Sequence, residues 1–147
     1  MQQRIRDVFA QQSFMTTLGA TIERVESGVV EVRLPFQPAL TQHTGVLHAG
    51  VVTSIADSAC AAAAATMMAP DADVVSVEFK LNLMRPSIGD YLRAVGTVVH
   101  AGRTLAVCRA DVFAVTGEDA SLVAVMQATM MAVTPRSSPP SQSAPAL

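Results

Sequence analysis

A chain of 147 residues has the length of one ordinary domain, which is long enough to bury a core without disulfides or metal ions. Its formal net charge is −2 with both signs spread along the chain, which argues against nucleic acid or an anionic membrane as a partner. Cys60 and Cys108 belong to no Cys-x-x-Cys or Cys/His cluster, so we expect no metal site.

The composition and the N-terminal segment also bear on location and assembly. The segment MQQRIRDVFAQQSF carries charges where a secretory signal requires an unbroken apolar run, so we expect a protein of the reducing cytoplasm. Half of the residues are hydrophobic but only 4% are aromatic, so the interior must be filled by small and flexible side chains. Such a core usually needs the help of a subunit interface.

The N-terminal third predicts a short helix followed by a hairpin. Apolar residues recur at helical spacing in residues 2–12, with charged residues on the other side, which indicates an amphipathic helix. Residues 20–26 and 29–34 are extended pieces separated by Ser27-Gly28. Apolar and charged residues alternate in the second piece, which is the period of a strand with one buried face.

After a loop that opens at Pro35 and runs to about Leu47, residues 49–69 form a nearly uniform run of small apolar residues. The run has about the length of a membrane span. Asp57 lies near its middle, however, and a carboxylate there would cost roughly 2.5–3.5 kcal/mol on membrane insertion. We therefore expect a long helix that is buried on nearly all sides in a soluble domain.

The remainder of the chain predicts extended structure. Four strand-like runs follow the helix, and they are residues 74–84, 91–99, 104–115 and 122–133. Gly102 and Gly117 lie between successive runs, so we expect a β-meander. One helix and several strands predict an α+β fold in which the sheet wraps the helix, within a single domain of residues 1–133. The tail, residues 134–147, is rich in Pro and Ser and is expected to be disordered.

Asp57 is the candidate functional residue on the helix. It shares a face with Thr53 and Ser54. A purely structural explanation is that Asp57 bonds Thr or Ser hydroxyls or faces solvent at the edge of the sheet, while a general base or nucleophile is the functional one. A helix that begins near Ala49 directs unpaired N–H groups out of its N-terminus, where they can bind an anion. Asp57 lies roughly 12 Å further along the axis, at ~1.5 Å per residue. A two-fold dimer would bring one helix start beside the Asp57 of a second copy.

With these features the sequence resembles the hotdog-fold acyl-CoA thioesterases of the phenylacetate-pathway (PaaI-like) group. That family shows Asn or Gln, then Gly, then Leu-His-Gly-Gly, and an acidic residue nine positions after the His. The matching residues are Gln42, Gly45, Leu47-His48-Ala49-Gly50 and Asp57. Ala49 replaces the family glycine, which keeps the backbone N–H, and we expect its methyl group to narrow the approach of the acyl group.

The resemblance continues beyond the helix and covers about residues 14–133. The family has a strand that begins with Ser or Thr and an acidic residue and is closed by Arg-Pro and Gly-Asp. Here the corresponding positions are Ser76, Glu78, Arg85-Pro86 and Gly89-Asp90, and a later Gly-Arg pair is Gly102-Arg103.

The resemblance implies a hotdog fold that dimerises, often into tetramers, and hydrolyses an acyl-CoA thioester without a cofactor. Asp57 would be the base that activates water or the nucleophile that forms a mixed anhydride. The Ala49 N–H would bind the oxyanion, and Gln42 and Ser76 would orient water, thioester or carboxylate. His48 would shape the turn rather than titrate. Substrate contacts are expected at the residues Gly50, Arg85 and Arg103, the two arginines facing CoA phosphates.

Two other functions stay open from the sequence. A hydratase or dehydratase of the same fold would pair His43 with Asp57 as the proton-transfer couple. A non-catalytic acyl-CoA-binding domain would use Asp57 only structurally. The acyl group is also open between phenylacetyl-type, hydroxybenzoyl-type and medium-chain groups.

Overall fold

The computed structural model describes residues 1–134, and the predicted tail lies outside them except for Thr134. The helices are α1 (Gln2–Ala10), α2 (Ser13–Leu18) and α3 (Ala49–Met67), with a short 3₁₀ turn at Pro38–Leu40. The strands are β1 (Thr21–Glu26), β2 (Val29–Pro35), β3 (Asp73–Leu83), β4 (Tyr91–Ala101), β5 (Leu105–Thr116) and β6 (Asp119–Val133). The predicted elements are present, and α2 is an addition that the sequence did not indicate.

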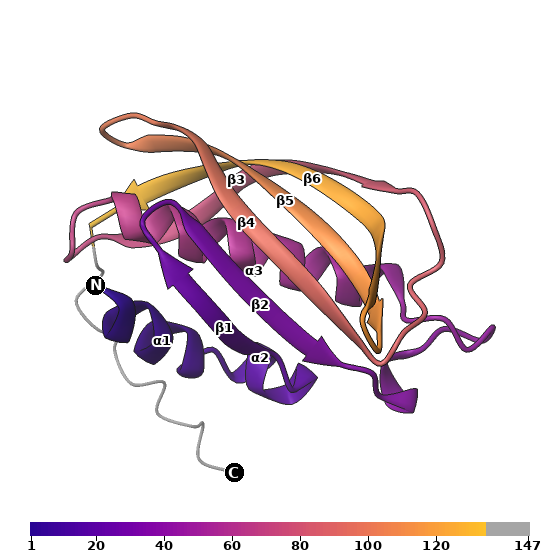
Figure 1. Cartoon of the computed structure of the whole chain (residues 1–147). Helices are drawn as coiled ribbons and strands as arrows, with labels where there is room; N and C mark the ends of the chain where they lie inside the picture. Colours follow the sequence, from indigo (N-terminus) through magenta and orange to yellow (C-terminus); the bar gives the residue numbers. More distant parts are fainter. Residues whose placement is uncertain (135–147) are drawn as a thin grey trace, which may run out of the picture.

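One antiparallel sheet curves around α3 in the strand order β1-β2-β4-β5-β6-β3, as Figure 1 shows. The α+β prediction of one helix wrapped by a sheet is confirmed, and the arrangement is the hotdog fold. The helix is apolar and long enough to cross a membrane, but the sheet covers it and residues such as Val52 and Ile55 are fully buried. It is therefore the core helix of the domain.

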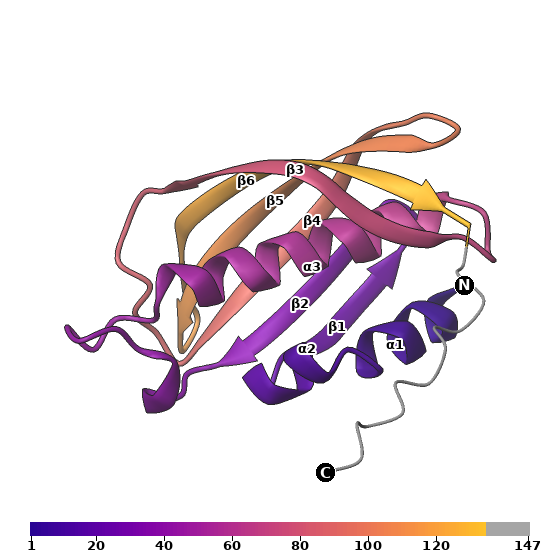
Figure 2. The same ribbon diagram turned by 180° about the vertical axis from the view of Figure 1, so that it is seen from behind.

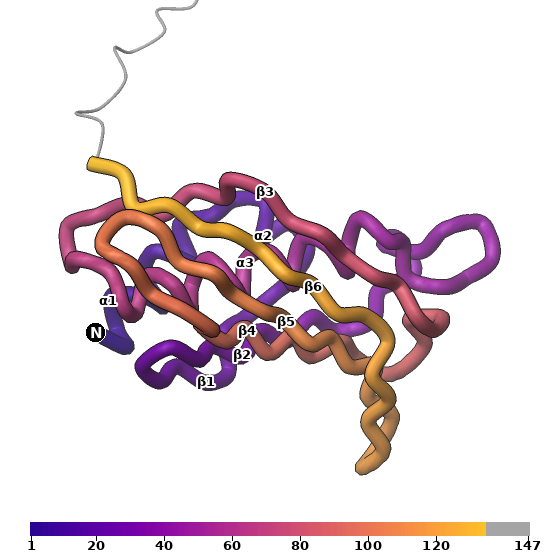
Figure 3. The backbone as a smooth tube through the Cα atoms, turned by 90° about the horizontal axis from the view of Figure 1, so that it is seen from above, coloured from indigo at the N-terminus to yellow at the C-terminus, as the bar shows by residue number. Residues whose placement is uncertain are grey.

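The predicted meander is correct only for β4, β5 and β6. Strand β3 pairs with β6 at the far edge, while β4 pairs with β2, where Val32 lies opposite Ala94. The link between β3 and β4, residues 84–90, contains Pro86 and is longer than a usual hairpin loop. This longer link lets the chain pass from β3 at the edge of the sheet across the ends of β6 and β5 to β4, as Figure 3 shows from above.

Helix and sheet approach closely because the facing residues are small. A methyl group added at Gly96 of β4 would lie 2.3 Å from the Ala59 carbonyl oxygen of α3, so only glycine fits there. The inward residues of β2, Val30, Val32 and Leu34, are fully buried beneath the helix, and the charged residues between them are not. The alternation predicted for this strand is confirmed.

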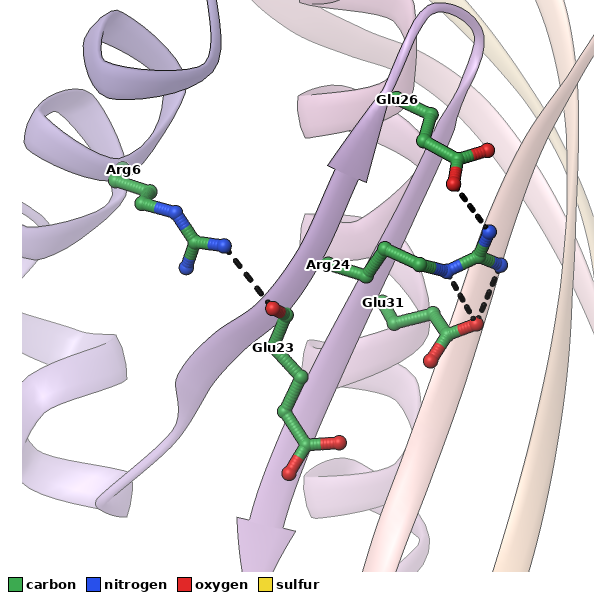
Figure 4. A network of polar contacts seen from close by, with 5 residues as sticks. All are labelled: Arg6, Glu23, Arg24, Glu26 and Glu31. Atoms are coloured by element: carbon green, nitrogen blue, oxygen red, sulfur yellow. Dashed lines mark hydrogen bonds and ion pairs between the residues drawn. The ribbon is translucent and has the colours of Figure 1, made fainter.

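The two edges of the sheet differ. Helix α1 lies along β1, and the Arg6 guanidinium donates hydrogen bonds to the carbonyl oxygens of Ile22 and Glu23 at 2.6 and 3.0 Å. Figure 4 shows the second of these bonds. Further along the hairpin, Arg24 forms ion pairs with Glu26 and Glu31. The β1 edge is thus covered. Within residues 1–134 the outer edge of β3 has no strand partner.

Candidate active site

The central pair of the site consists of Asp57 on α3 and Ser76 on β3. The Ser76 hydroxyl donates a hydrogen bond of 2.7 Å to Oδ1 of Asp57. Asp57 is partly buried and Ser76 is exposed, so the carboxylate is open to solvent rather than sealed in the core. The second carboxylate oxygen, Oδ2, accepts no hydrogen bond from residues 1–134, which leaves it available to water or substrate.

Thr53 and Ser54, the helical neighbours of Asp57, do not bond its carboxylate in this structure. The hydroxyls of Thr53 and Ser54 donate to the carbonyl oxygens one turn earlier, those of Ala49 and Gly50, at 2.8 and 2.7 Å. Such back-bonding is the usual behaviour of these side chains inside a helix. The partner of Asp57 is therefore supplied by the strand, as the resemblance implied for Ser76.

The start of α3 forms the second part of the site. His48 is the N-cap residue, and its Nδ1 accepts a hydrogen bond of 2.9 Å from the Gly50 N–H. The Ala49 N–H, in contrast, donates to no acceptor among residues 1–134. The turn-shaping role expected of His48 matches this geometry. The Gly50 N–H is thus already hydrogen-bonded to His48. A methyl group added at Gly50 would lie 3.1 Å from His48 Nδ1, so the glycine leaves room for the capping ring.

The loop before α3 holds Gln42 and His43. The Gln42 side-chain amide donates to the Thr44 hydroxyl at 3.0 Å, and its main chain closes the turn through bonds with Gly45 and Val46. Both Gln42 and His43 are exposed. No hydrogen bond or ion pair joins His43 to Asp57 in the described chain, so one subunit does not form the couple that a hydratase would need.

The two arginines proposed for CoA lie at opposite ends of the sheet. Arg85 Nη1 donates to the Leu122 carbonyl oxygen at 2.7 Å, near the start of β6. Arg103 lies in the β4–β5 turn, where neighbouring Thr104 receives the N–H of Ala132 near the end of β6. At ~3.3 Å per residue, these ends of β6 are roughly 33 Å apart. One chain therefore does not bring Arg85 and Arg103 to the same phosphate group.

The two cysteines lie in the core of the domain. Cys60 and Cys108 are free and buried. Burial raises the pKa of the Cys108 thiol to about 11 and that of Cys60 further still, so both stay protonated and unreactive at neutral pH. In the part of the chain that the structure describes, no cluster of His, Cys, Asp or Glu could hold a metal ion.

The sequence did not predict that α1 packs beside α3. Helix α1 borders the face of α3 that carries Asp57, and its apolar residues Ile5, Val8 and Phe9 line a cavity there. The helical spacing of these three residues was visible, but a pattern of period 3.6 says which face is buried and not which element it faces.

Comparison with known proteins agrees with the fold. A domain of the Thioesterase superfamily matches residues 44–121, more than half of the chain, and this range contains Asp57, Ala49 and Ser76. A protein of Halobacterium salinarum described as an esterase is 27% identical over 103 residues, which are 67% of this chain and 68% of that protein.

Solved structures give the same result. A thioesterase family protein from Silicibacter pomeroyi is 43% identical, covers 90% of this chain and 98% of its own, and has a TM-score of 0.88. A conserved protein of Pseudomonas aeruginosa is 31% identical with coverages of 83% and 94% and a TM-score of 0.76. The PaaI protein of the phenylacetic acid degradation operon of E. coli shares the fold, with 20% identity, coverages of 89% and 91% and a TM-score of 0.80.

The match to the family over residues 44–121, together with the hotdog fold, defines the class of this protein. The chain belongs to the Thioesterase superfamily, and at the level of that family it is a thioester hydrolase.

Proposed function

We propose that the protein hydrolyses acyl-CoA thioesters at a site shared by two copies of the chain. The observation that carries this proposal is the open Asp57 carboxylate, whose Oδ1 accepts the Ser76 hydrogen bond while Oδ2 accepts none from residues 1–134. A carboxylate fixed on one oxygen and free on the other is suited to accept a proton from water or to attack a carbonyl carbon.

The chemistry has two forms that use the same groups. In the first, Asp57 takes a proton from water while the hydroxide adds to the thioester carbonyl carbon. In the second, an Asp57 oxygen adds to that carbon, CoA leaves as the thiolate, and water then hydrolyses the mixed anhydride. Both forms place negative charge on the carbonyl oxygen, where a preorganised N–H such as that of Ala49 is worth about 2.7–4 kcal/mol. Both end with the free acid and CoA.

The separation within one chain supports a shared site. The Ala49 N–H and Asp57 are eight residues apart on α3, roughly 12 Å along the axis, which is too far for one reacting carbonyl. A second copy of α3 running in the opposite direction would bring its Ala49 N–H beside Asp57. Each dimer would then contain two equivalent sites.

Strand β3 is the surface through which we propose that the dimer forms. Its outer edge has no strand partner within residues 1–134, and it exposes apolar side chains that include Val75, Val77 and Phe79 at 41%, 52% and 45%. A long apolar edge strand is a template for pairing with another chain. Pairing of two β3 strands would also bring the Ser76 residues, and with them the Asp57 carboxylates, close to the subunit boundary.

The remaining predicted residues have supporting roles in this proposal. Gln42 lies two residues beyond the short Pro38–Leu40 turn and would orient the thioester or the attacking water from the partner's side. His48 and Gly50 would hold the helix start in the conformation that directs the Ala49 N–H outward. Arg85 and Arg103 lie at opposite ends of the sheet, so only one of them from each subunit would contact the phosphates of a given CoA.

The test is hydrolysis of an acyl-CoA panel by Asp57→Asn, followed by detection of the released thiol. Asparagine has nearly the shape of aspartate and still accepts the Ser76 hydrogen bond, but it is neither a base nor a nucleophile. We expect kcat to fall by about 10²–10⁴, the usual contribution of a general base. The matched control is Asp119→Asn at the β5–β6 turn, which should retain full activity.

Each other result has a defined meaning. Turnover near the wild-type value in folded Asp57→Asn would remove Asp57 from the mechanism. Binding of CoA thioesters by the wild-type protein without release of thiol would indicate a non-catalytic domain. Loss of enoyl-thioester absorbance without thiol release would indicate a hydratase.

A further inference from the structure

A cavity of about 270 Å³ lies between α1 and the second half of α3. Figure 2 shows α1 beside this part of α3, near the start of β3. Apolar side chains from both helices form its walls, and they are Ile5, Val8, Phe9, Ala61, Ala62 and Ala65. The α3 side chains are all alanine, so it is their small size that leaves the space empty.

Asp57 and Ser76 do not themselves line the cavity, but two residues of its wall lie next to them along α3 and β3. Ala61, on its wall, is one helical turn after Asp57 and on the same face, where neighbouring Cβ atoms are about 5–6 Å apart. Val74, also on the wall, is two residues before Ser76 on β3 and points to the same side of the sheet. From there the cavity extends along α3 toward Ala65, roughly 12 Å beyond Asp57.

The charges around the cavity favour an uncharged occupant. Asp71 and Asp73 lie at its rim, and they would repel a carboxylate. The one cationic residue of the lining, Arg4, is already engaged, since it donates to the carbonyl oxygens of Ala65 and Pro70 at 2.7 and 2.9 Å. The interior therefore offers apolar surface without an available charge partner.

The outer wall of the cavity is held in place. Arg4 joins α1 to the end of α3, and Arg6 joins it to β1 through the carbonyl oxygens of Ile22 and Glu23. Ile5 and Phe9 are buried in the core between these two anchors. A wall fixed at both sides lowers the ordering cost of binding, which favours a preformed subsite.

We infer that this cavity binds the acyl group of the thioester, an inference that rests on the proposed function. The acyl chain enters between Ala61 and Val74 when its carbonyl carbon lies at Asp57, and CoA leaves in the opposite direction. A cavity of ~150 Å³ takes up benzene, so a volume of about 270 Å³ accommodates about ten carbon atoms. The substrate class is an uncharged apolar acyl group of medium length, either aliphatic or carrying one aromatic ring.

Affinity should depend on chain length in a defined way. Each methylene that enters the cavity should improve binding about fourfold, equivalent to ~0.8 kcal/mol. The improvement should stop once the cavity is full. A chain that ends in a carboxylate should bind more weakly than its methyl-ended counterpart.

The test measures binding of S-methyl-CoA and S-octyl-CoA, thioethers that cannot be hydrolysed, by calorimetry. Ala65→Leu fills the far end of the cavity with a good helix former and leaves the Asp57 region unchanged. We expect its affinity for S-octyl-CoA to fall about fiftyfold, for roughly three displaced methylenes, and its affinity for S-methyl-CoA to stay the same. The matched control is Ala10→Leu, which lines a separate hollow between α1 and β1 and should leave both affinities unchanged.

The outcomes separate the subsite from the reaction. If Ala65→Leu binds S-octyl-CoA as tightly as the wild-type protein, or if Ala10→Leu is the variant that weakens it, the inference is overturned. If the binding pattern is as expected but the wild-type protein releases no thiol from octanoyl-CoA, the subsite stands and the proposed hydrolysis fails. If the wild-type protein and both variants hydrolyse thioesters with the same preference for acyl-chain length, the subsite is overturned and the proposed hydrolysis stands.

Discussion

Three residues set the geometry of the candidate site, and each acts through a different part of the fold. Asp57 comes from the middle of α3, Ser76 from the edge strand, and Ala49 from the first position of the helix. A carboxylate among alanines is costly unless it is satisfied, and here one hydroxyl satisfies one oxygen. Neither Oδ2 of Asp57 nor the Ala49 N–H is hydrogen-bonded within residues 1–134, so both are available to a ligand.

His48 provides a prediction at this scale, because its side chain caps α3 through the Gly50 N–H. His48→Ala should lose this hydrogen bond and lower the free energy of unfolding by about 1 kcal/mol, whereas His48→Asn, a good N-cap residue, should retain most of it. Hydrolysis should follow the same order, since the cap also fixes the direction of the Ala49 N–H. The measurement is urea unfolding with thiol release in parallel. Equal stability of the two variants would show that the cap contributes nothing.

Some of these residues could be predicted from the sequence and others could not. Asp57 and His48 were indicated by their spacing of nine residues and by the resemblance. That the Gly50 N–H is occupied by His48 could not be predicted, because a histidine ring can reach several donors at a helix start and only the folded structure shows which one it takes. Likewise, no local pattern indicated that Thr53 and Ser54 bond the helix backbone instead of Asp57.

At the scale of elements, the spacing of apolar residues in the sequence predicted the long helix and most strands, but it did not predict the position of β3 in the sheet. Its burial pattern differs from that of β4 because one edge of β3 is unpaired, so exposed apolar residues such as Val77 and Phe79 interrupt the expected alternation. Strand order depends on contacts distant in sequence, and consecutive strands are the default assumption. The proline-containing link, residues 84–90, was the one local signal against a hairpin.

The β3 edge yields the prediction at this scale. Val77→Lys places a charge on the proposed dimer surface, so the variant should sediment as a monomer at micromolar concentration and lose hydrolysis, since each site needs both subunits. Val99→Lys is the matched control, because Val99 is an apolar strand residue with 65% exposure, compared with 52% for Val77, and lies outside that surface. Analytical ultracentrifugation and thiol release decide the question. A folded Val77→Lys monomer with normal activity would contradict the shared site.

At the scale of the whole molecule, one buried cluster includes residues of α1, α2 and α3 and of every strand except β3, whose partly buried Val74 and Leu81 pack against it. We therefore propose that residues 1–133 form a single domain. The protein's distribution of small residues has a consequence for this core. Gly96 and the alanines of α3 allow the sheet to approach the helix closely. The alanines on the other face of α3 are equally small, so space for a substrate is left between that face and α1.

The central claim is that each active site takes Asp57 from one subunit and the Ala49 N–H from the other, and complementation between two inactive variants tests it. Asp57→Asn removes the carboxylate. Ala49→Pro removes the N–H at the first helical position, where proline is tolerated, and the extended backbone of His48, with φ −63° and ψ 143°, suits a residue before proline. Loss of one oxyanion donor should lower kcat by about 10²–10³.

The two chains are expressed together with different affinity tags, and the mixed dimer is purified through both. One of its two sites then combines an intact Asp57 with an intact Ala49 N–H, so the mixed dimer should recover about half of the wild-type activity while each parent stays inactive. A mixed dimer as inactive as its parents would mean that both groups act within the same chain, and the two-subunit active site would be refuted.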